Sequence, residues 1–406
     1  MKKRITIDQL RPGMYVTAAD KGWLYLPFFS RKIKSERVVD KLRDSGVLEV
    51  IIDLTKGRDV DQGSQPVERP QQPQEKSPPA GEAGEVLHKL EQSRELHDGV
   101  LSATSDMMER VRKGEMISEK EADIQVNQLV DQVLADSQSL LCISVLKNTG
   151  EYVFNHCIHT SILVLFLGRS LGMARNEMLA LGKGALLHDI GKCMVPKEIL
   201  HKPGRLSHEE FEIMRNHVSL GVRYLEKANC FGPDVISFVA QHHERMNGSG
   251  YPLALRGEDI SWTAKLGIVV DIYDTLIHKN YYKTPEDPGS VLDTMSRMTL
   301  SLIDKDAFEA LAKCLGAYPP GTLMLLDTGE MAVSYEPNLQ MPDRPKVLVV
   351  TRPDGIFCSP PIPALLSEPA ENGEGFRRSV VTSLSPEDAN FDPLAYLSGN
   401  ASNYQL

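Results

Sequence analysis

The hydrophobic pattern of this chain is helical over most of its length. From residue 84 to 315, apolar residues recur at intervals of three and four, and no stretch alternates between apolar and polar positions as a half-buried strand does. Ile158 to Leu171 is apolar on nearly all sides, which predicts a helix at the centre of the fold. The pattern therefore predicts a mainly all-α protein with a helical bundle over 84–315.

Two capping-box sequences predict helix starts inside this bundle. In each, a serine precedes a glutamate by three residues: Ser118 with Glu121, and Ser207 with Glu210. Each box is followed by apolar residues at helical spacing, which we expect to face the core. The first stripe is Ile124, Val126, Leu129, Val130 and Val133, and the second is Phe211, Met214, Val218, Val222 and Leu225.

Smaller units flank the bundle. Residues 1–60 are predicted to form a small α/β module. Residues 61–83 are dominated by Gln, Pro, Glu, Ser and Gly, a composition that buries too little apolar surface to fold and predicts a disordered, flexible linker. The Pro- and Gly-rich residues 316–366 predict a small β appendage, and the polar tail 367–406 is expected to be poorly ordered. Within the first module we expect strands at Arg4–Ile7, Met14–Val16 and Val47–Asp53 and a helix at Ser35–Ser45.

Composition narrows the class of protein. The 45 basic and 55 acidic residues give a net charge of −10, which argues against a protein that binds duplex nucleic acid through a basic face. The longest apolar run, Ile162 to Leu167, is far shorter than the roughly 18 residues of a membrane span. No apolar segment of a secretory signal follows the N-terminal Lys-Lys-Arg. The six cysteines are scattered without a C-x-x-C pair, which predicts a cytoplasmic protein without a disulfide framework.

Histidines concentrate on segments whose other residues are typical of a buried core. Eight of the 11 lie between residues 156 and 243. A buried carboxylate beside a buried imidazole, as in His188-Asp189, is costly unless both are satisfied, and a metal ion does so. Helical spacing turns further histidines and an aspartate to the same interior. The candidate ligands are His156, His188, Asp189, His217, His242, His243 and Asp271.

This donor set predicts a site for two metal ions. Imidazoles and carboxylates without a thiolate suit Fe, Mn or Zn. Seven donors are too many for one tetrahedral ion but fit two, and a pair of ions activates a bridging water and neutralises phosphate oxygens in phosphoester hydrolysis. Lys192, one helical turn after Asp189, would add a fixed positive charge for the transition state.

The segment after the paired histidines predicts a tight loop at the rim of the site, because Asn247-Gly248 and Ser249-Gly250 precede Tyr251-Pro252. Three other residues are left out of the main set of candidate ligands. His97 is expected to form a surface pair with Asp98, and His159 is a weak candidate ligand. Glu244 is expected either to orient His243 or to lie solvated at a helix end.

These motifs together resemble the HD-GYP phosphodiesterases of the HD superfamily. The resemblance covers roughly residues 135–285, and the first 60 residues resemble a module of unknown function that often precedes such domains. It implies an HD-domain helical bundle. The matching pieces are Tyr152-x-x-x-His156, His188-Asp189-x-Gly191-Lys192, His217-x-x-x-Gly221, His242-His243-Glu244 through Gly250-Tyr251-Pro252, and Asp271-x-Tyr273-Asp274.

The resemblance implies hydrolysis of cyclic di-GMP to linear pGpG, and in some members on to GMP, by a hydroxide that bridges two divalent ions, Fe or Mn. Asp189 would bridge the ions, and Lys192 would hold the scissile phosphate. Gly250, Tyr251 and Pro252 would contact diguanylate cyclase (GGDEF) partners. The resemblance assigns His156, His188 and Asp271 to one ion and His217, His242 and His243 to the other.

Three positions depart from the family pattern. Tyr152 stands where some members have a glutamate for a third ion, so we expect two ions. Asn247 replaces an aspartate to which no metal role attaches. Asn280 and Lys283 replace two arginines whose basic ends reach the nucleotide. Of these two positions, only Lys283 keeps the positive charge and is expected to contact substrate. The alternatives are a catalytically weak adaptor that binds cyclic dinucleotides, and an HD phosphohydrolase for another nucleotide.

Overall fold

The computed structural model describes residues 2–11, 14, 16–19, 39, 49–53, 80–146, 152–277, 288–384, 389 and 391–397. The α-helices are α2 (Ala80–Arg112), α3 (Glu119–Leu146), α4 (Tyr152–Ser170), α5 (Arg175–Leu187), α6 (Lys197–Leu200), α7 (His208–Arg215), α8 (His217–Ala228), α9 (Pro233–Gln241), α10 (Trp262–Ile277), α11 (Pro288–Met298), α12 (Lys305–Leu315) and α14 (Pro393–Leu397). The 3-10 helices are η1 (Ile7–Gln9), η3 (Ile190–Met194) and η4 (Gly257–Asp259). The strands are β1 (Lys2–Thr6), β2 (Val16–Ala19), β3 (Glu49–Asp53), β4 (Leu323–Leu326), β5 (Met331–Glu336), β6 (Lys346–Thr351), β7 (Phe357–Leu365) and β8 (Val380–Ser383).

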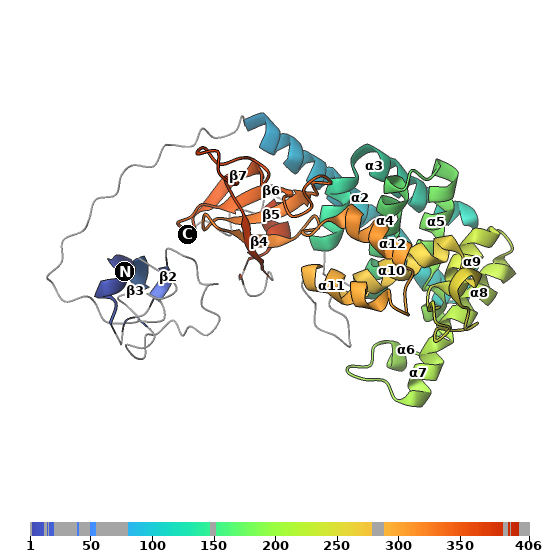
Figure 1. The fold of residues 1–406 in the computed structure, drawn as a ribbon. Coiled ribbons are helices and arrows are strands. Elements are labelled where there is room, and N and C mark those ends of the chain that lie inside the picture. Colours follow the sequence, from blue (N-terminus) through green and yellow to red (C-terminus); the bar gives the residue numbers. More distant parts are fainter. Residues whose placement is uncertain are drawn as a thin grey trace.

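Helix α4 is the centre of the helical bundle, as its sequence predicts. It packs against α3, α5 and α10, and also against α2 and α12 (Figure 1). Every described side chain from Phe154 to Leu167 is buried, as expected for a helix at the centre of the fold. The first helix of the bundle, α2, begins at Ala80, inside the segment predicted as linker. The rest of that predicted linker lies outside the described residues.

The Ser207–Glu210 capping box forms, and at the start of α3 the Glu121 carboxylate accepts from the Ser118 backbone N–H and hydroxyl, but each apolar stripe contains an error. Asn216 ends α7 and a new helix begins at His217, so the stripe is broken where one continuous helix was expected. No residue of α7 is buried, and Phe211 is exposed; α6 and α7 project from the bundle (Figure 1). In α3, Ile124 is exposed because it precedes the buried Val126 by two residues, about 200° around the helix.

Helix α3 is the one helix in the described parts of the chain with the length and apolarity of a membrane span. Its most apolar window has a mean hydropathy of 1.3, and 56% of that window is buried inside the protein. The helix is interrupted at Asp136, whose backbone is non-helical, and it packs against α2, α4 and α5. Core helices of globular domains have the same properties, so this helix is only weak support for a membrane span.

The C-terminal sheet is larger than the predicted appendage. Its five antiparallel strands have the order β7-β6-β5-β4-β8. β8 and α14 belong to the segment 367–406, so the prediction of a poorly ordered tail is wrong for them. Arg378 is buried in an ion pair with Glu330, and Phe391 and Tyr396 pack in a core shared with α2 and α3. These few anchoring residues order a segment whose average composition is polar.

The N-terminal module contains an antiparallel sheet with the order β1-β3-β2. β1 and β3 lie where strands were predicted, except that Ile7 begins η1. β2 begins at Val16, where the predicted strand was to end. Apart from Val39, the helix predicted at Ser35–Ser45 lies outside the described residues.

Candidate metal centre

The seven predicted ligands converge at one place in the bundle. His156 comes from α4, and His188 and Asp189 follow the end of α5. His217 begins α8, and Asp271 lies on α10. The paired histidines His242 and His243 follow α9 directly. All of these side chains are buried except that of His243, which is half-buried.

The ligand atoms fall into two groups. In the first, His156, His188 and Asp271 each offer an atom within 4.8 Å of the others. The Nε2 atom of His156 lies 2.9 Å from an Asp271 carboxylate oxygen and 3.2 Å from His188 Nε2. Burial alone would raise the pKa of Asp271, but the close approach of His156 lowers it to about 2, so Asp271 is ionised at neutral pH.

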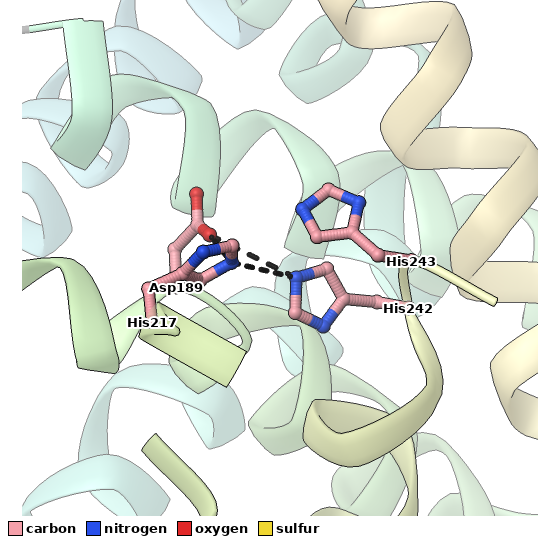
Figure 2. A group of neighbouring side chains, drawn as sticks. All are labelled: Asp189, His217, His242 and His243. Atoms are coloured by element: carbon pink, nitrogen blue, oxygen red, sulfur yellow. Dashed lines mark hydrogen bonds and ion pairs between the residues drawn. The ribbon is translucent and has the colours of Figure 1, made fainter. Parts of the chain in front are cut away.

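The second group contains Asp189, His217, His242 and His243, again with ligand atoms within 4.8 Å of one another. Figure 2 shows these four side chains turned toward a common point. Burial, reinforced by neighbouring imidazoles, holds the pKa of His242 and of His243 well below the usual range. Both rings are therefore neutral at pH 7, the form that binds a metal.

Backbone hydrogen bonds fix which nitrogen of the histidines is free to coordinate. The Nδ1 atoms of His188, His217 and His242 donate to the carbonyl oxygens of residues three positions earlier, Ala185, Met214 and Val239. In a neutral imidazole this leaves a lone pair on Nε2. The Nε2 atoms of His217 and His242 nevertheless lie only 3.3 Å apart. Two facing lone pairs repel unless a cation lies between them.

Asp189 lies between the two groups. Its Oδ2 lies 3.4 Å from His188 Nε2, and its Oδ1 lies 3.3 Å from His217 Nε2. Oδ1 is buried and makes no hydrogen bond in the described structure. Burial would raise the pKa of Asp189, but the positive charge of Lys192 and the neighbouring histidines hold it well below its usual range. An ionised carboxylate with an unsatisfied buried oxygen fits a ligand that bridges two cations.

The thiol of Cys157 is close enough to His188 and Asp189 to suggest a further ligand. Burial raises its pKa to about 12, so the thiol is protonated at neutral pH. The donors that fit a metal are therefore imidazoles and carboxylates, as the sequence predicts.

Two glycines allow the backbone of η3 to approach α8. A Cβ at Gly191 would overlap the backbone of His217 and of Gly221, and Gly221 packs against Gly191 in return. This close approach brings Asp189, at the start of η3, within reach of His217, at the start of α8. The short distance between the candidate ligands Asp189 and His217 thus requires glycine at positions 191 and 221.

The Gly-Tyr-Pro loop contacts the metal centre directly. The ring of Tyr251 lies 4.8 Å from that of His243, measured between centroids, and its backbone N–H donates to the His243 carbonyl oxygen. The guanidinium of Arg215 lies 4.6 Å from the Tyr251 ring centroid. Gly250 has no room for a side chain, since a Cβ would stand 2.4 Å from the backbone of Glu244 and Arg245. The loop is tight, as predicted, and Pro252 is exposed at its outer side.

Glu244 has neither of the two roles that the sequence suggested. It is fully buried, and its carboxylate oxygens accept hydrogen bonds from the backbone N–H groups of Leu253 and Leu255. It therefore holds the far side of the Gly-Tyr-Pro loop. The sequence offered one signal for this, a charged residue directly after two predicted interior histidines.

Two further residues near the site differ from the sequence interpretation. His97 is buried and does not lie at the surface as predicted, although its Nδ1 does lie 3.8 Å from an Asp98 carboxylate oxygen; its ring packs 5.5 Å from that of His159. Asp274 is also fully buried, and its Oδ2 lies 2.7 Å from Nδ1 of His156. The sequence motif contains Asp274, but spacing alone gave it no role.

Three residues singled out in the sequence cannot be placed. Lys283, the predicted substrate contact, and Asn280 lie outside the described residues. The backbone of Tyr152 begins α4, but its side chain lies outside the described structure.

Two family models match separate parts of the chain. A family model described as HD domain matches residues 129–307, and one described as Domain of unknown function (DUF3391) matches residues 2–122. Cyclic di-GMP phosphodiesterase PA4108 of Pseudomonas aeruginosa is 33% identical over 346 residues, which cover 83% of this chain and 82% of that protein. The chain belongs to the HD-GYP phosphodiesterase family. This confirms the resemblance, and the N-terminal match extends well beyond residue 60, through α2.

Other HD-GYP relatives match a smaller part of the chain. Cyclic di-GMP phosphodiesterase of Thermotoga maritima is 32% identical over 151 residues, 36% of this chain and 40% of that protein. The 3'3'-cGAMP-specific phosphodiesterase 1 of Vibrio cholerae is 30% identical over 179 residues, 44% of this chain and 41% of that protein. The relatives' names thus include two different cyclic dinucleotides.

Proposed function

We propose that this HD-GYP protein is a metal-dependent phosphodiesterase that hydrolyses cyclic di-GMP. The observation that carries the proposal is the arrangement around Asp189, whose buried Oδ1 lies 3.3 Å from a His217 nitrogen that itself faces His242 Nε2 at 3.3 Å. These acceptors need a cation, and a pair of cations suits phosphodiester cleavage.

Two divalent ions, Fe or Mn, fit the proposed ligand set. His156, His188 and Asp271 would hold one, and His217, His242 and His243 the other, with Asp189 shared. When bound, such ions supply an activated water and neutralise charge on the phosphate. The buried, preordered imidazoles leave little freedom to be lost when the ions bind.

Lys192 would hold the scissile phosphate. Its Nζ pairs with Oδ2 of Asp189, at the junction of the two ligand groups, and its side chain is 18% exposed, so it can meet a substrate oxygen. Hydrolysis adds the oxygen of a water to phosphorus and breaks the bond to the 3′ oxygen, which leaves with a proton. The product is linear pGpG, and a second hydrolysis of the same kind would give GMP.

The Gly-Tyr-Pro loop is proposed as the contact for a diguanylate cyclase (GGDEF) partner in the cytoplasm. Pro252 and the adjoining Leu253 are exposed, and the Leu253 residue is 60% accessible to solvent. Lys283 is proposed as a substrate contact on the strength of its motif position.

A second candidate substrate is another cyclic dinucleotide. Asn280 replaces a basic residue of the family pattern, and the 3'3'-cGAMP-specific relative matches 44% of this chain. An adaptor that binds the nucleotide without turnover is the remaining alternative.

The test is a turnover assay on the full chain, loaded with Mn(II) or Fe(II) and with its metal content measured. Cyclic di-GMP, 3'3'-cGAMP and cyclic di-AMP are compared, with Asp189→Asn as the inactive reference. Cleavage of cyclic di-GMP at the highest kcat/KM supports the proposal. Higher kcat/KM with another cyclic dinucleotide selects the second candidate, and binding without a linear product selects the adaptor.

A further inference from the structure

Among the hydrogen-bonded histidines of the metal centre, His156 differs in how its outer nitrogen is held. His188, His217 and His242 each donate Nδ1–H to a neutral backbone carbonyl. His156 instead places Nδ1 2.7 Å from a carboxylate oxygen of Asp274, which lies one turn after Asp271 on α10. Both carboxylates of α10 therefore meet opposite nitrogens of one imidazole.

A carboxylate at this position does more than a carbonyl can. It fixes the Nδ1–H tautomer and the ring orientation, and its negative charge makes Nε2 a better electron donor to a cation. Asp274 is fully buried, so little solvent weakens this charge. The Nε2 atom that results points to Asp271 at 2.9 Å and to His188 at 3.2 Å, where the first ligand group is assembled.

Asp274 is itself held from a second direction. Its other carboxylate oxygen lies 3.6 Å from Nδ1 of His159, one turn after His156 on α4. His159 is buried, and its ring packs against that of His97 on α2. His159 thus faces Asp274 and α2, and it does not belong to either group of candidate ligands in the described structure. Groups from α2, α4 and α10 together fix the position of the Asp274 carboxylate.

We infer that Asp274 is a positioning residue that sets the affinity of one of the two cation sites, the one that His156 completes. It acts through His156 and touches neither the cation nor the substrate. The inference rests on the proposed metal centre, but it does not require the proposed substrate. It predicts an asymmetry, because His217 and His242 of the other site are held by backbone carbonyls, whereas His156 is held by Asp274.

The experiment is a calorimetric titration of the metal-free full chain with Mn(II), followed in parallel by electron paramagnetic resonance. Three variants are compared with the unaltered protein. Asp274→Ala removes the carboxylate, and Asp274→Asn keeps an oxygen acceptor of the same shape without the charge. Asp304→Asn is the matched control, because Asp304 is a partly buried aspartate that caps α12 and pairs with Lys265.

The expected result is that one binding step weakens and the other does not. Asp274→Ala should raise one dissociation constant by about 10- to 100-fold, as removal of a histidine's carboxylate partner does elsewhere, with a smaller increase for Asp274→Asn. The second dissociation constant should stay within about twofold, and Asp304→Asn should alter neither.

Two results would overturn the inference. If both steps weaken equally in Asp274→Ala, the residue supports the fold and not one site. If both constants are unchanged in a folded Asp274→Ala protein, it has no positioning role. Failure of the unaltered protein to bind Mn(II), Fe(II) or Zn(II) would instead contradict the proposed function, so the two failures are distinguishable.

Discussion

A Cβ atom at Gly191 would stand 1.8 Å from the carbonyl oxygen of His217. No side chain fits there, and the obstacle is backbone, which cannot rotate away. Gly191 is therefore in contact with His217, the candidate ligand at the start of α8. This contact sets the distance in space between the His188-Asp189-x-Gly191-Lys192 motif and the His217-x-x-x-Gly221 motif.

Gly191→Ala should separate η3 from α8 and so move Asp189 away from His217. We expect loss of at least one cation and a destabilisation of about 1–3 kcal/mol, typical of overpacking. Metal analysis and urea unfolding measure the two effects. Gly99→Ala is the matched control, since nothing lies within 4 Å of a Cβ at this exposed position in α2. That change should stabilise the protein by about 0.5–1 kcal/mol; equal behaviour of the two variants would contradict the argument.

Lys192→Ala should lower kcat by about 100- to 1,000-fold while the protein still binds two cations, because it removes a charge that stabilises the transition state. Steady-state kinetics together with metal analysis separates this from loss of the ions. Lys197→Ala, an exposed lysine at the start of α6, serves as the control and should behave as the unaltered enzyme. An active Lys192→Ala protein would remove Lys192 from the proposed mechanism.

Glu244→Ala should loosen the Gly-Tyr-Pro loop, because the N–H groups of Leu253 and Leu255 lose their acceptors. Hydrogen bonds to a charged group contribute about 1.5–3 kcal/mol each, so local opening of the loop should increase. Hydrogen exchange at these two amides measures it directly. Glu258→Ala provides a comparison, since the Glu258 side chain is 95% exposed. Unchanged exchange in Glu244→Ala would show that other contacts hold the loop.

Removal of metal should destabilise the folded protein. A cation that binds only the folded state contributes about 2.7 kcal/mol when its free concentration is 100 times its dissociation constant. Thermal unfolding with Mn(II) or with a chelator should therefore differ by several degrees. In Asp189→Ala the difference should disappear, because the shared ligand is missing. A chelator that leaves the unfolding temperature of the unaltered protein unchanged would argue against a resident metal.

The residues of the site were predictable from sequence to a large extent, and their environment was not. Candidate ligands such as His188, Asp189 and Asp271 interrupt core-forming patterns, and the cost of burying them already indicates a cation. The partners of these ligands come from other helices. His97 was placed at the surface because its neighbour in sequence is an aspartate, whereas its neighbour in space is His159.

The errors in the fold have similarly local causes. Phe211 was assigned to the core by extending one helical pattern across Asn216, where the chain starts a new helix. The C-terminal residues were judged by average composition, although Arg378, Phe391 and Tyr396 suffice to anchor them. Periodicity predicts a helix well, but it gives neither its breaks nor the tertiary contacts of a single side chain.

The contact between Tyr251 and His243 has a consequence for regulation. A protein that binds the Gly-Tyr-Pro loop and shifts the Tyr251 ring would also displace His243, which is proposed to hold a cation. Occupancy of the centre and recruitment of such a protein would then be thermodynamically linked, and each would alter the affinity for the other by the same factor. Cellular iron or manganese supply would in that case govern which complexes the enzyme joins, as well as how fast it works.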